Sequence, residues 1–387
     1  MADSDRAWFV LAKARIAAPL LRELLQRHGS AAGIAALTAR ELRQAGLPEA
    51  AQKAIRNPDE SAIEADLEWL SQADNHIVHP QSEFWPELFS QLSDAPTLIY
   101  VRGQPQTLHL PALAIVGSRN PTRGGVLNAY EFARHLGGAG FCILSGLAQG
   151  IDTAAHKGAL DATARTIGVL GHGIDRVYPA LNHELAHRIA GQGALISEYA
   201  LGTHPRREHF PERNRLISGL SLGTLVVEAA RRSGSLITAR LAAEQGREVF
   251  AIPGSIHNAL SRGCHQLIRQ GAKLVESADD IVSELGPLVA HLMQNSRTQQ
   301  TASMPPTDTP PQHDEEYDRL ISALGHDPAT VDELAQQSGL TIGQVSSMLL
   351  ILELEGKIEA LNSGQYARLG RSSRHERERA RRADVSF

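Results

Sequence analysis

The chain has 387 residues, of which 42% are hydrophobic, and a formal net charge of −5. This length is enough for two or three domains, and the hydrophobic fraction is enough to bury a core. The two cysteines show no CxxC spacing, which argues against a disulfide framework or a cysteine-bound zinc. Because no segment has the pattern of a signal peptide or the length of a membrane span, we expect a cytoplasmic protein with no membrane partner.

Residues 1–72 are rich in alanine and leucine, and their apolar positions recur with the spacing of short helices. A Gly-Leu-Pro turn at 46–48 separates two of these helical stretches. Short helices joined by such turns resemble a SAM-like or helix-hairpin-helix module. The same pattern also fits a small helical domain that only packs, so the function of this segment stays open.

Residues 73–290 are predicted to form an α/β domain. After a short strand at 96–100, apolar runs alternate with segments of helix length, and they lie at 112–116, 141–144, 166–170, 194–197, 224–228, 249–252 and 273–275. Strongly apolar strands that alternate with helices are typical of a parallel sheet covered on both faces. The sequence therefore predicts a Rossmann-like, doubly wound, mostly parallel sheet.

The C-terminal part is predicted to be a separate module on a linker. The linker spans 291–313 and contains the run NSRTQQTASMPPTDTPPQ, with four prolines. Residues 314–370 read as a winged helix, with helices at 315–324, 330–338 and 341–355 and strands at 357–361 and 365–369. The Arg-rich end, 371–387, is expected to be a disordered basic tail.

Charge is distributed unevenly between these parts. Residues 112–290 hold 18 Lys and Arg against 15 Asp and Glu, a net charge of +3, whereas 314–370 hold 3 against 10, a net charge of −7. An anionic ligand is therefore expected on the α/β domain. The acidic winged helix is a poor candidate for binding duplex DNA alone, and a regulatory or protein-docking role suits it better.

The strand-to-helix loops of the α/β domain are rich in small residues. Parallel sheets bind ligands at the carboxyl ends of their strands, where backbone amides and helix N-termini attract phosphate. We therefore predict phosphate contacts at Gly117, Ser118, Arg119, Gly146, Gly171, Gly173 and Ser235. The alternative is that these glycines only form tight turns.

A cluster of basic residues surrounds one aromatic residue between the fourth and fifth core strands. Phe210 lies among Arg206, Arg207, Arg213 and Arg215. An aromatic ring with neighbouring cations is what binding of single-stranded nucleic acid requires, since the ring stacks on bases and the cations hold phosphates. A core role for Phe210 and a salt-bridge role for Arg119 are the alternatives, and Lys157 and Arg165 are weaker candidates for phosphate contact.

Several catalytic or cofactor sites are not predicted. The first loop, GSRNPTRGG, is not the dinucleotide motif GxGxxG, Ser145 stands where that site needs an acidic residue, and there is no P-loop motif. The histidines are scattered, with no pair expected at helical ligand spacing beside a carboxylate, and no catalytic triad is evident. The sequence therefore predicts no catalytic residue, no cofactor and no metal.

The motifs of residues 75–290 resemble the DprA (Smf) family of DNA-processing proteins. They are GSR at 117–119, SGLAQGIDTAAH at 145–156, SEY at 197–199, FPERNRLIS at 210–218, TLVVEA at 224–229, SGSLITA at 233–239 and GREVFAIPG at 246–254. The resemblance implies a protein, not an enzyme, that binds and protects single-stranded DNA and loads RecA onto it in natural transformation. It implies DNA contacts at Arg119, Arg207, Phe210, Asn214 and Arg215, and a homodimer formed through Leu267, Ile268 and Leu274.

An enzyme is the rival hypothesis. Gly223-Thr224 followed by Glu228 resembles part of the motif of the LOG-type nucleotide phosphoribohydrolases, but Ser221-Leu222 stand where that motif has glycines. A purely structural oligomerisation protein is a third possibility, although it would not explain the arginine cluster.

Limited proteolysis tests the predicted domain boundaries. Residues 295–312 have too few apolar side chains to be held in a fold, so a protease of broad specificity should cut there first. Mass spectrometry should then find a stable fragment close to residues 1–290. A first cut within 112–290 would contradict these boundaries.

Overall fold

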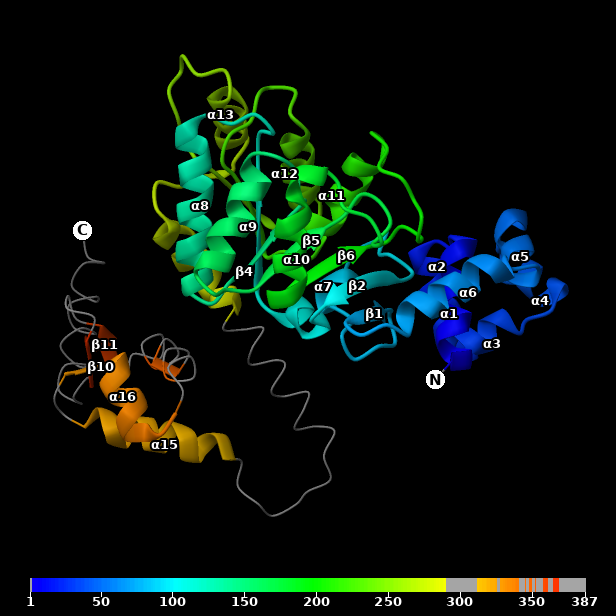
Figure 1. Ribbon diagram of the computed structural model, residues 1–387, viewed down its shortest axis with the longest axis horizontal. Coiled ribbons are helices and arrows are strands. Elements are labelled where there is room, and N and C mark those ends of the chain that lie inside the picture. The colour runs from blue at the N-terminus through cyan, green and yellow to red at the C-terminus, as the bar shows by residue number, and fades with distance from the viewer. Residues whose placement is uncertain are drawn as a thin grey trace, which may run out of the picture. The chain divides into compact units, whose positions relative to one another are not determined.

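The computed structural model describes residues 2–289 and, in the C-terminal part, 312–325, 328–340, 358–360 and 365–368, with single residues at 345, 348, 349 and 352. The chain divides into two compact units, Met1–Gly286 and Pro287–Phe387, which are described separately (Figure 1). Nearly all of the predicted linker at 291–313, most of the predicted helix at 341–355 and the whole predicted tail at 371–387 lie outside the described residues.

The N-terminal segment is helical, as predicted. Its helices are α1 (Ala2–Ala14), α2 (Ala18–His28), α3 (Ala31–Ala35), α4 (Ala39–Gln44), α5 (Glu49–Arg56) and α6 (Glu60–Leu70). Local capping fixes several boundaries. Before α4, the Thr38 hydroxyl accepts the Glu41 N–H at 3.3 Å while the Glu41 carboxylate accepts the Thr38 N–H at 2.8 Å. After α2, Gly29 adopts a left-handed conformation with φ of 77° that ends the helix.

A nine-stranded sheet forms the centre of this unit. Its strands are β1 (Asn75–Val78), β2 (Ile99–Gly103), β3 (Ala112–Val116), β4 (Cys142–Ser145), β5 (Thr166–Val169), β6 (Ala194–Ser197), β7 (Gly223–Val226), β8 (Glu248–Ala251) and β9 (Lys273–Leu274). Strands β3 to β9 pair in parallel, while β1 pairs with β2 and β2 with β6 in antiparallel fashion. The predicted doubly wound, mostly parallel sheet is confirmed, and β1 is a strand that the sequence analysis missed.

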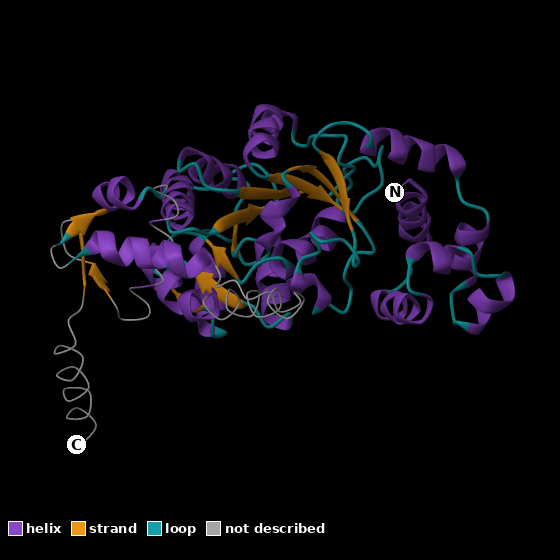
Figure 2. Ribbon diagram, turned by 90° about the horizontal axis from the view of Figure 1, so that it is seen from below, coloured by secondary structure: helices purple, strands orange, loops and turns teal. Residues whose placement is uncertain are grey.

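Helices cover both faces of this sheet (Figure 2). They are α8 (Arg123–Gly138), α9 (Ile151–Asp161), α10 (His183–Gln192), α11 (His209–Gly219), α12 (Gly234–Glu244), α13 (Ser261–Arg269) and a stretch at 278–289, with the short helices α7 (Glu87–Ser90), η1 (Pro105–His109) and η2 (Ala180–Asn182). Every residue of the central strands β3 to β7 is buried, whereas β8 and β9 at one side of the sheet are partly or fully exposed. Burial on both faces explains why these strands read as continuous apolar runs.

The strand order creates one topological switch point. The sheet runs β1-β2-β6-β5-β4-β3-β7-β8-β9, so the chain moves outward from β3 to β6 and then returns to the other side of β3 at β7. Connections from β3 and β7 therefore leave in opposite directions and open a crevice at the carboxyl ends of these strands. The loops singled out in the sequence lie along this edge.

The N-terminal helices pack directly against the sheet and share a core with it. The Phe9 ring of α1 and the Trp69 ring of α6 lie 5.9 and 5.5 Å from the Tyr100 ring of β2. The buried Asp66 carboxylate accepts hydrogen bonds from the Tyr100 hydroxyl at 3.0 Å and from the Lys13 ammonium at 2.6 Å. Because this carboxylate joins two helices to a strand, the helical segment is part of the same compact unit as the sheet.

The C-terminal unit contains α15 (Gln312–Leu324), β10 (Ala329–Thr330), α16 (Val331–Ser338), β11 (Ile358–Ala360) and β12 (Gln365–Arg368). Its three strands form an antiparallel sheet in the order β10-β12-β11. Leu320, Leu334, Leu349 and Ile358 contribute to its core. A Thr330–Glu333 capping box starts α16, and Gly339 ends it with φ of 70°. Two helices and a hairpin agree with the predicted winged helix.

Two histidines, the partly buried His79 and the fully buried His156, make the stability of the first unit depend on pH. His79 stacks on Trp8 with ring centroids 4.1 Å apart, and burial lowers its pKa from 6.5 to about 4. His156 is fully buried with its Nδ1 2.7 Å from the Thr166 hydroxyl, and burial lowers its pKa to about 3. Below pH 6.5 the unfolded chain binds protons at these residues while the folded chain does not, so acid favours unfolding.

We predict that the free energy of unfolding falls as pH drops from 6.5 towards 4, by about 1 kcal/mol per pH unit for His156. Replacing His156 by Gln removes the group that takes up a proton on unfolding, so the free energy of unfolding should depend less steeply on pH. Denaturant unfolding at several pH values, followed by tryptophan fluorescence, measures this dependence. His135→Gln, at an exposed histidine that pairs with Asp279, is the control and should keep the parent slope. An unchanged slope in His156→Gln would contradict the assignment.

Candidate nucleic-acid interface

The loop after β3 is fixed by a carboxylate from the end of β7. Glu228 is 7% exposed, and its carboxylate accepts the Thr122 N–H at 2.9 Å and the Thr122 hydroxyl at 2.7 Å. The Thr122 hydroxyl also accepts the Gly125 N–H at 3.0 Å and so caps α8. The two strands at the switch point are thereby tied together. Arg119, three residues before Thr122, is left exposed on the loop.

The loop after β4 is held by a carboxylate from the first turn of α9. The buried Asp152 carboxylate accepts the N–H groups of Gly146 at 3.1 Å and Ala148 at 3.3 Å. Burial raises the pKa of Asp152, and the nearby Arg213 guanidinium opposes that rise. Since the Gly146 N–H already donates to Asp152, the structure gives this amide a role other than the predicted phosphate contact.

Helix α11 crosses the sheet edge and carries the buried Arg213. This side chain is 3% exposed and donates hydrogen bonds to the Gly146 carbonyl at 2.8 Å and to the Val169 carbonyl. Burial lowers its pKa to about 10, so it remains a cation at neutral pH. A methyl group on residue 146 would lie 2.6 Å from its guanidinium, which explains why a glycine stands there. Arg213 therefore joins α11 to the ends of β4 and β5.

Phe210, one turn before Arg213 on α11, presents its ring at this edge. The ring is half-buried, and its centroid lies 5.3 Å from the Arg119 guanidinium and 5.9 Å from that of Arg213. A methyl group on residue 171 would lie 3.1 Å from the ring, so Gly171 makes room for it. Tyr178, which is 47% exposed, lies 5.8 Å from the Phe210 centroid.

The remaining arginines of the cluster have different surroundings. Arg206 and Arg207 are exposed immediately before α11. Arg215 is instead paired with the Glu198 carboxylate and lies 3.4 Å from that of Asp94, with its side chain 19% exposed. The half-buried Asn214 accepts a hydrogen bond from Arg213 Nε at 3.2 Å. Two exposed arginines, Arg206 and Arg207, are thus followed within ten residues by two arginines, Arg213 and Arg215, that are engaged by the protein itself.

Three predicted residues do not gather around Phe210. Arg165 precedes β5 at the opposite edge of the sheet and donates to the Gln192 carbonyl at 2.8 Å. Lys157 is exposed on the second half of α9, away from the end that faces the loops. Ser235 is 7% exposed, with its hydroxyl 2.6 Å from that of Ser233.

The glycines at the strand ends accommodate protein atoms. A methyl group on residue 117 would lie 2.6 Å from Ile151, and one on residue 173 would collide with the Asp175 carboxylate. Ser118 accepts the Asn120 N–H on its hydroxyl at 3.1 Å. We expected these small residues to admit a ligand to the backbone; in the structure the close approaches are made by the chain itself.

Two features were missed in the sequence. Tyr178 was not predicted as a site residue; it belongs to the run LGHGID…YP…N at 170–182, another motif typical of the DprA family, and that motif is the signal that could have identified it. His183 and His187 lie four residues apart on α10 with Glu184 between them, the HExxH spacing, and their ring centroids are 4.6 Å apart. Among the described residues, however, no group of three or more His, Cys, Asp or Glu is placed to hold a metal ion. Within the same part of the chain, no helix is long and apolar enough to cross a membrane.

Comparison with known proteins agrees with the motifs at this edge. The family model described as DNA recombination-mediator protein A matches residues 76–286, and the DprA winged helix domain matches residues 304–364. Protein Smf of Escherichia coli is 41% identical over 339 residues, which cover 86% of this chain and 87% of that protein. DNA processing protein DprA of Streptococcus pneumoniae is 46% identical over 200 residues, covering 52% of this chain and 71% of that protein.

Solved structures give the same relationship. The X-ray structure of DprA from Streptococcus pneumoniae has a TM-score of 0.65 and 35% identity, and the match covers 72% of this chain and 97% of that one. A structure that describes the single-stranded DNA binding mode of DprA from Helicobacter pylori has a TM-score of 0.50 and 30% identity, with 55% of this chain and 95% of that one covered. The chain therefore belongs to the DprA (Smf) family of DNA-processing proteins.

Proposed function

We propose that this protein binds single-stranded DNA on the surface formed by Arg119, Arg207 and Phe210, called the edge surface below. The observation that carries the proposal is the half-buried Phe210 ring with the exposed Arg119 guanidinium 5.3 Å from its centroid. An exposed cation beside an aromatic ring offers a phosphate and a base their preferred contacts at one place.

The chemistry favours single strands over duplexes. A base can stack on the Phe210 ring only if its face is exposed, and paired bases in a duplex are already stacked on their neighbours. Arg119 and Arg207 would supply the charge that holds the backbone. The DprA structure from Helicobacter pylori, which describes the single-stranded DNA binding mode of that protein, supports single-stranded DNA as the ligand.

The other predicted residues take supporting roles in this proposal. Arg213 is buried and holds α11 in place, and Arg215 is neutralised by Glu198 and Asp94. Gly171 leaves room for the Phe210 ring, Ser118 bonds within the Arg119 loop and Asn214 bonds to Arg213 on α11. Lys157 and Arg165 stay outside it because they lie elsewhere on the sheet and helices.

Family membership extends the proposal to the cellular process. We place the protein in the cytoplasm, where it would protect incoming single-stranded DNA and load RecA onto it during natural transformation. RecA and a second copy of the chain are then its protein partners. The acidic winged helix would act in docking or regulation instead of holding DNA.

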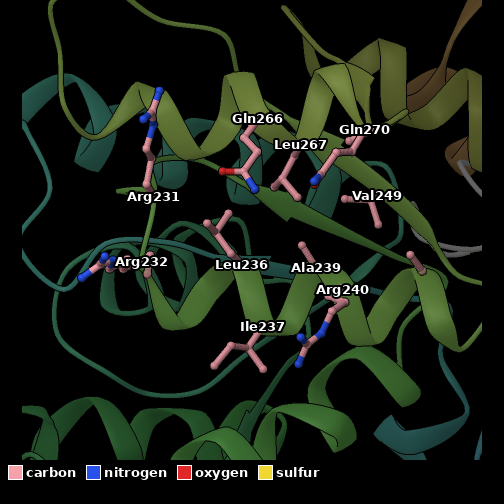
Figure 3. Close-up of a pocket in the computed structure, with 13 residues that line it drawn as sticks. Arg231, Arg232, Leu236, Ile237, Ala239, Arg240, Val249, Gln266, Leu267 and Gln270 are labelled. Carbon is pink, nitrogen blue, oxygen red and sulfur yellow. The ribbon is translucent and has the colours of Figure 1, made fainter.

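A homodimer would form through α13 and β9. Leu274 is 45% exposed on β9, which is the outermost strand on one side of the sheet, and Ile268 is partly buried on α13. Beside them a pocket of about 530 Å³ is lined by Leu236, Leu267 and Val249, with Arg231, Arg232 and Arg240 also lining it (Figure 3). Leu267 is only 8% exposed and packs in the core, so Ile268 and Leu274 are the better probes of an interface.

The phosphoribohydrolase alternative is weakened by the surroundings of Glu228. Its carboxylate is engaged by Thr122, and a methyl group on residue 125 would lie 2.5 Å from it. This carboxylate therefore fastens a loop and has little room for a substrate. Measuring base release from nucleoside monophosphates distinguishes the two functions, and we expect no release above the uncatalysed rate.

Substitution at the edge surface should separate charge from stacking. Arg119→Ala should weaken binding to oligo-dT and reduce the slope of log affinity against log salt by about 0.7, the value of one single-strand phosphate contact. Phe210→Ala should cost about 1–3 kcal/mol of binding with little change in salt slope. Fluorescence anisotropy at several salt concentrations measures both effects.

Arg165→Ala is the matched control. It removes an arginine at the amino ends of the parallel strands, away from the edge surface, so this variant should bind like the parent. Circular dichroism and thermal melting show whether each variant is folded. If folded Arg119→Ala and Phe210→Ala both bind oligo-dT as the parent does, the edge surface is not the DNA site.

Light scattering tests the proposed dimer. Ile268→Glu and Leu274→Glu would each place an unpaired charge in the interface, so both should give monomers with an unchanged circular dichroism spectrum. Leu127→Glu, at a leucine of α8 that is 58% exposed, is the control and should leave the dimer intact. Dimers that persist in both interface variants would move the contact elsewhere.

A further inference from the structure

Tyr178 is an exposed aromatic residue in an otherwise anchored loop. The loop follows β5, and both of its ends are buried: Ile174 is 2% exposed and Asn182 is 1% exposed. The Asn182 amide donates to the Leu147 carbonyl at 2.9 Å and to the Thr153 hydroxyl at 3.0 Å. The Gly173 N–H donates to the Thr203 carbonyl at 3.0 Å. Tyr178 is thus held in place although 47% of its surface faces solvent.

The Tyr178 ring extends the surface that Phe210 begins. The two ring centroids lie 5.8 Å apart, with 39° between the ring planes, and Arg119 faces the Phe210 ring. A single exposed aromatic residue needs no explanation. Two aromatic rings with a guanidinium beside them form a continuous apolar strip with a cation along it. Tyr178 and Arg119 lie on loops and Phe210 on the first turn of α11, all at the carboxyl ends of the parallel strands.

The ring geometry decides how bases could use this strip. A base sandwiched between two parallel rings needs a gap of about 6.8 Å, twice the 3.4 Å spacing of stacked bases. The rings are closer than that and are tilted, so one base cannot insert between them. Each ring is instead free to stack on a base of its own, as in proteins that bind successive bases of a single strand.

We propose that Tyr178 is a second stacking platform, which contacts the base next to the one on Phe210. The inference rests on the proposed function, because it assigns a further residue to the same single-stranded DNA site. Its chemistry needs the aromatic ring and not the hydroxyl. Phenylalanine at position 178 should therefore preserve binding to single-stranded DNA, and alanine should weaken it.

The test compares an oligo-dT with the same oligonucleotide carrying abasic sites, on the full chain. Tyr178→Ala should weaken oligo-dT binding about 5- to 100-fold, the range expected for one stacked base, with an unchanged salt slope. Tyr178→Phe should stay within about twofold of the parent by the same reasoning. Leu181→Ala, at a leucine three residues away that is 65% exposed, is the control and should bind normally.

A second readout does not depend on loss of binding. Tyr178→Trp places an indole on the strip, and its fluorescence should be quenched when oligo-dT binds but not when the abasic oligonucleotide binds. Equal losses on both oligonucleotides in Tyr178→Ala, or no quenching in Tyr178→Trp, would overturn the inference. If Arg119→Ala and Phe210→Ala lose binding while Tyr178→Ala does not, the inference fails and the proposed function stands. If none of the three loses binding, both fail.

Discussion

The buried guanidinium of Arg213 is the constraint on which the candidate site depends. A buried cation without partners would be strongly destabilising, so its position is fixed by the groups that satisfy it. Here those groups are the carbonyls of Gly146 and Val169, at the ends of β4 and β5, with the Asp152 carboxylate close by. Helix α11 must therefore lie across the sheet edge. Phe210, three residues earlier on α11, comes to lie beside Arg119 as a consequence.

This arrangement divides the arginines of one short segment between two tasks. Arg213 and Arg215 have their charges satisfied by carbonyls and carboxylates of the protein, while Arg206 and Arg207 face solvent. Only the second pair can add long-range attraction for a polyanion, because a paired cation contributes little net field. The rigid part of the edge thus positions the ring, and the exposed part supplies charge. The pair Glu228–Thr122 performs the same positioning task for the loop that carries Arg119.

The sequence was sufficient for the sheet and insufficient for the contacts at its edge. Strands such as β3 are buried on both faces, so their apolar runs were visible without knowledge of their neighbours. By contrast, Arg207 and Arg213 look equivalent in the sequence, and only the fold shows that one is exposed and the other buried. Gly146 and Gly171 were correctly placed at strand ends, but the atoms that approach them come from α11, which is distant in sequence. The exposure of Tyr178 beside Phe210 could not be read from the sequence, because the two residues are brought together only by the fold.

Amide hydrogen exchange with and without a saturating oligo-dT tests the central claim most directly, because it reports where along the chain the strand lies. We expect slower exchange in peptides that cover 117–122, 171–178 and 205–214, and unchanged exchange in β9 and in the described part of the winged helix. Protection confined to α12 and α13, or to the winged helix, with none at these loops, would contradict it.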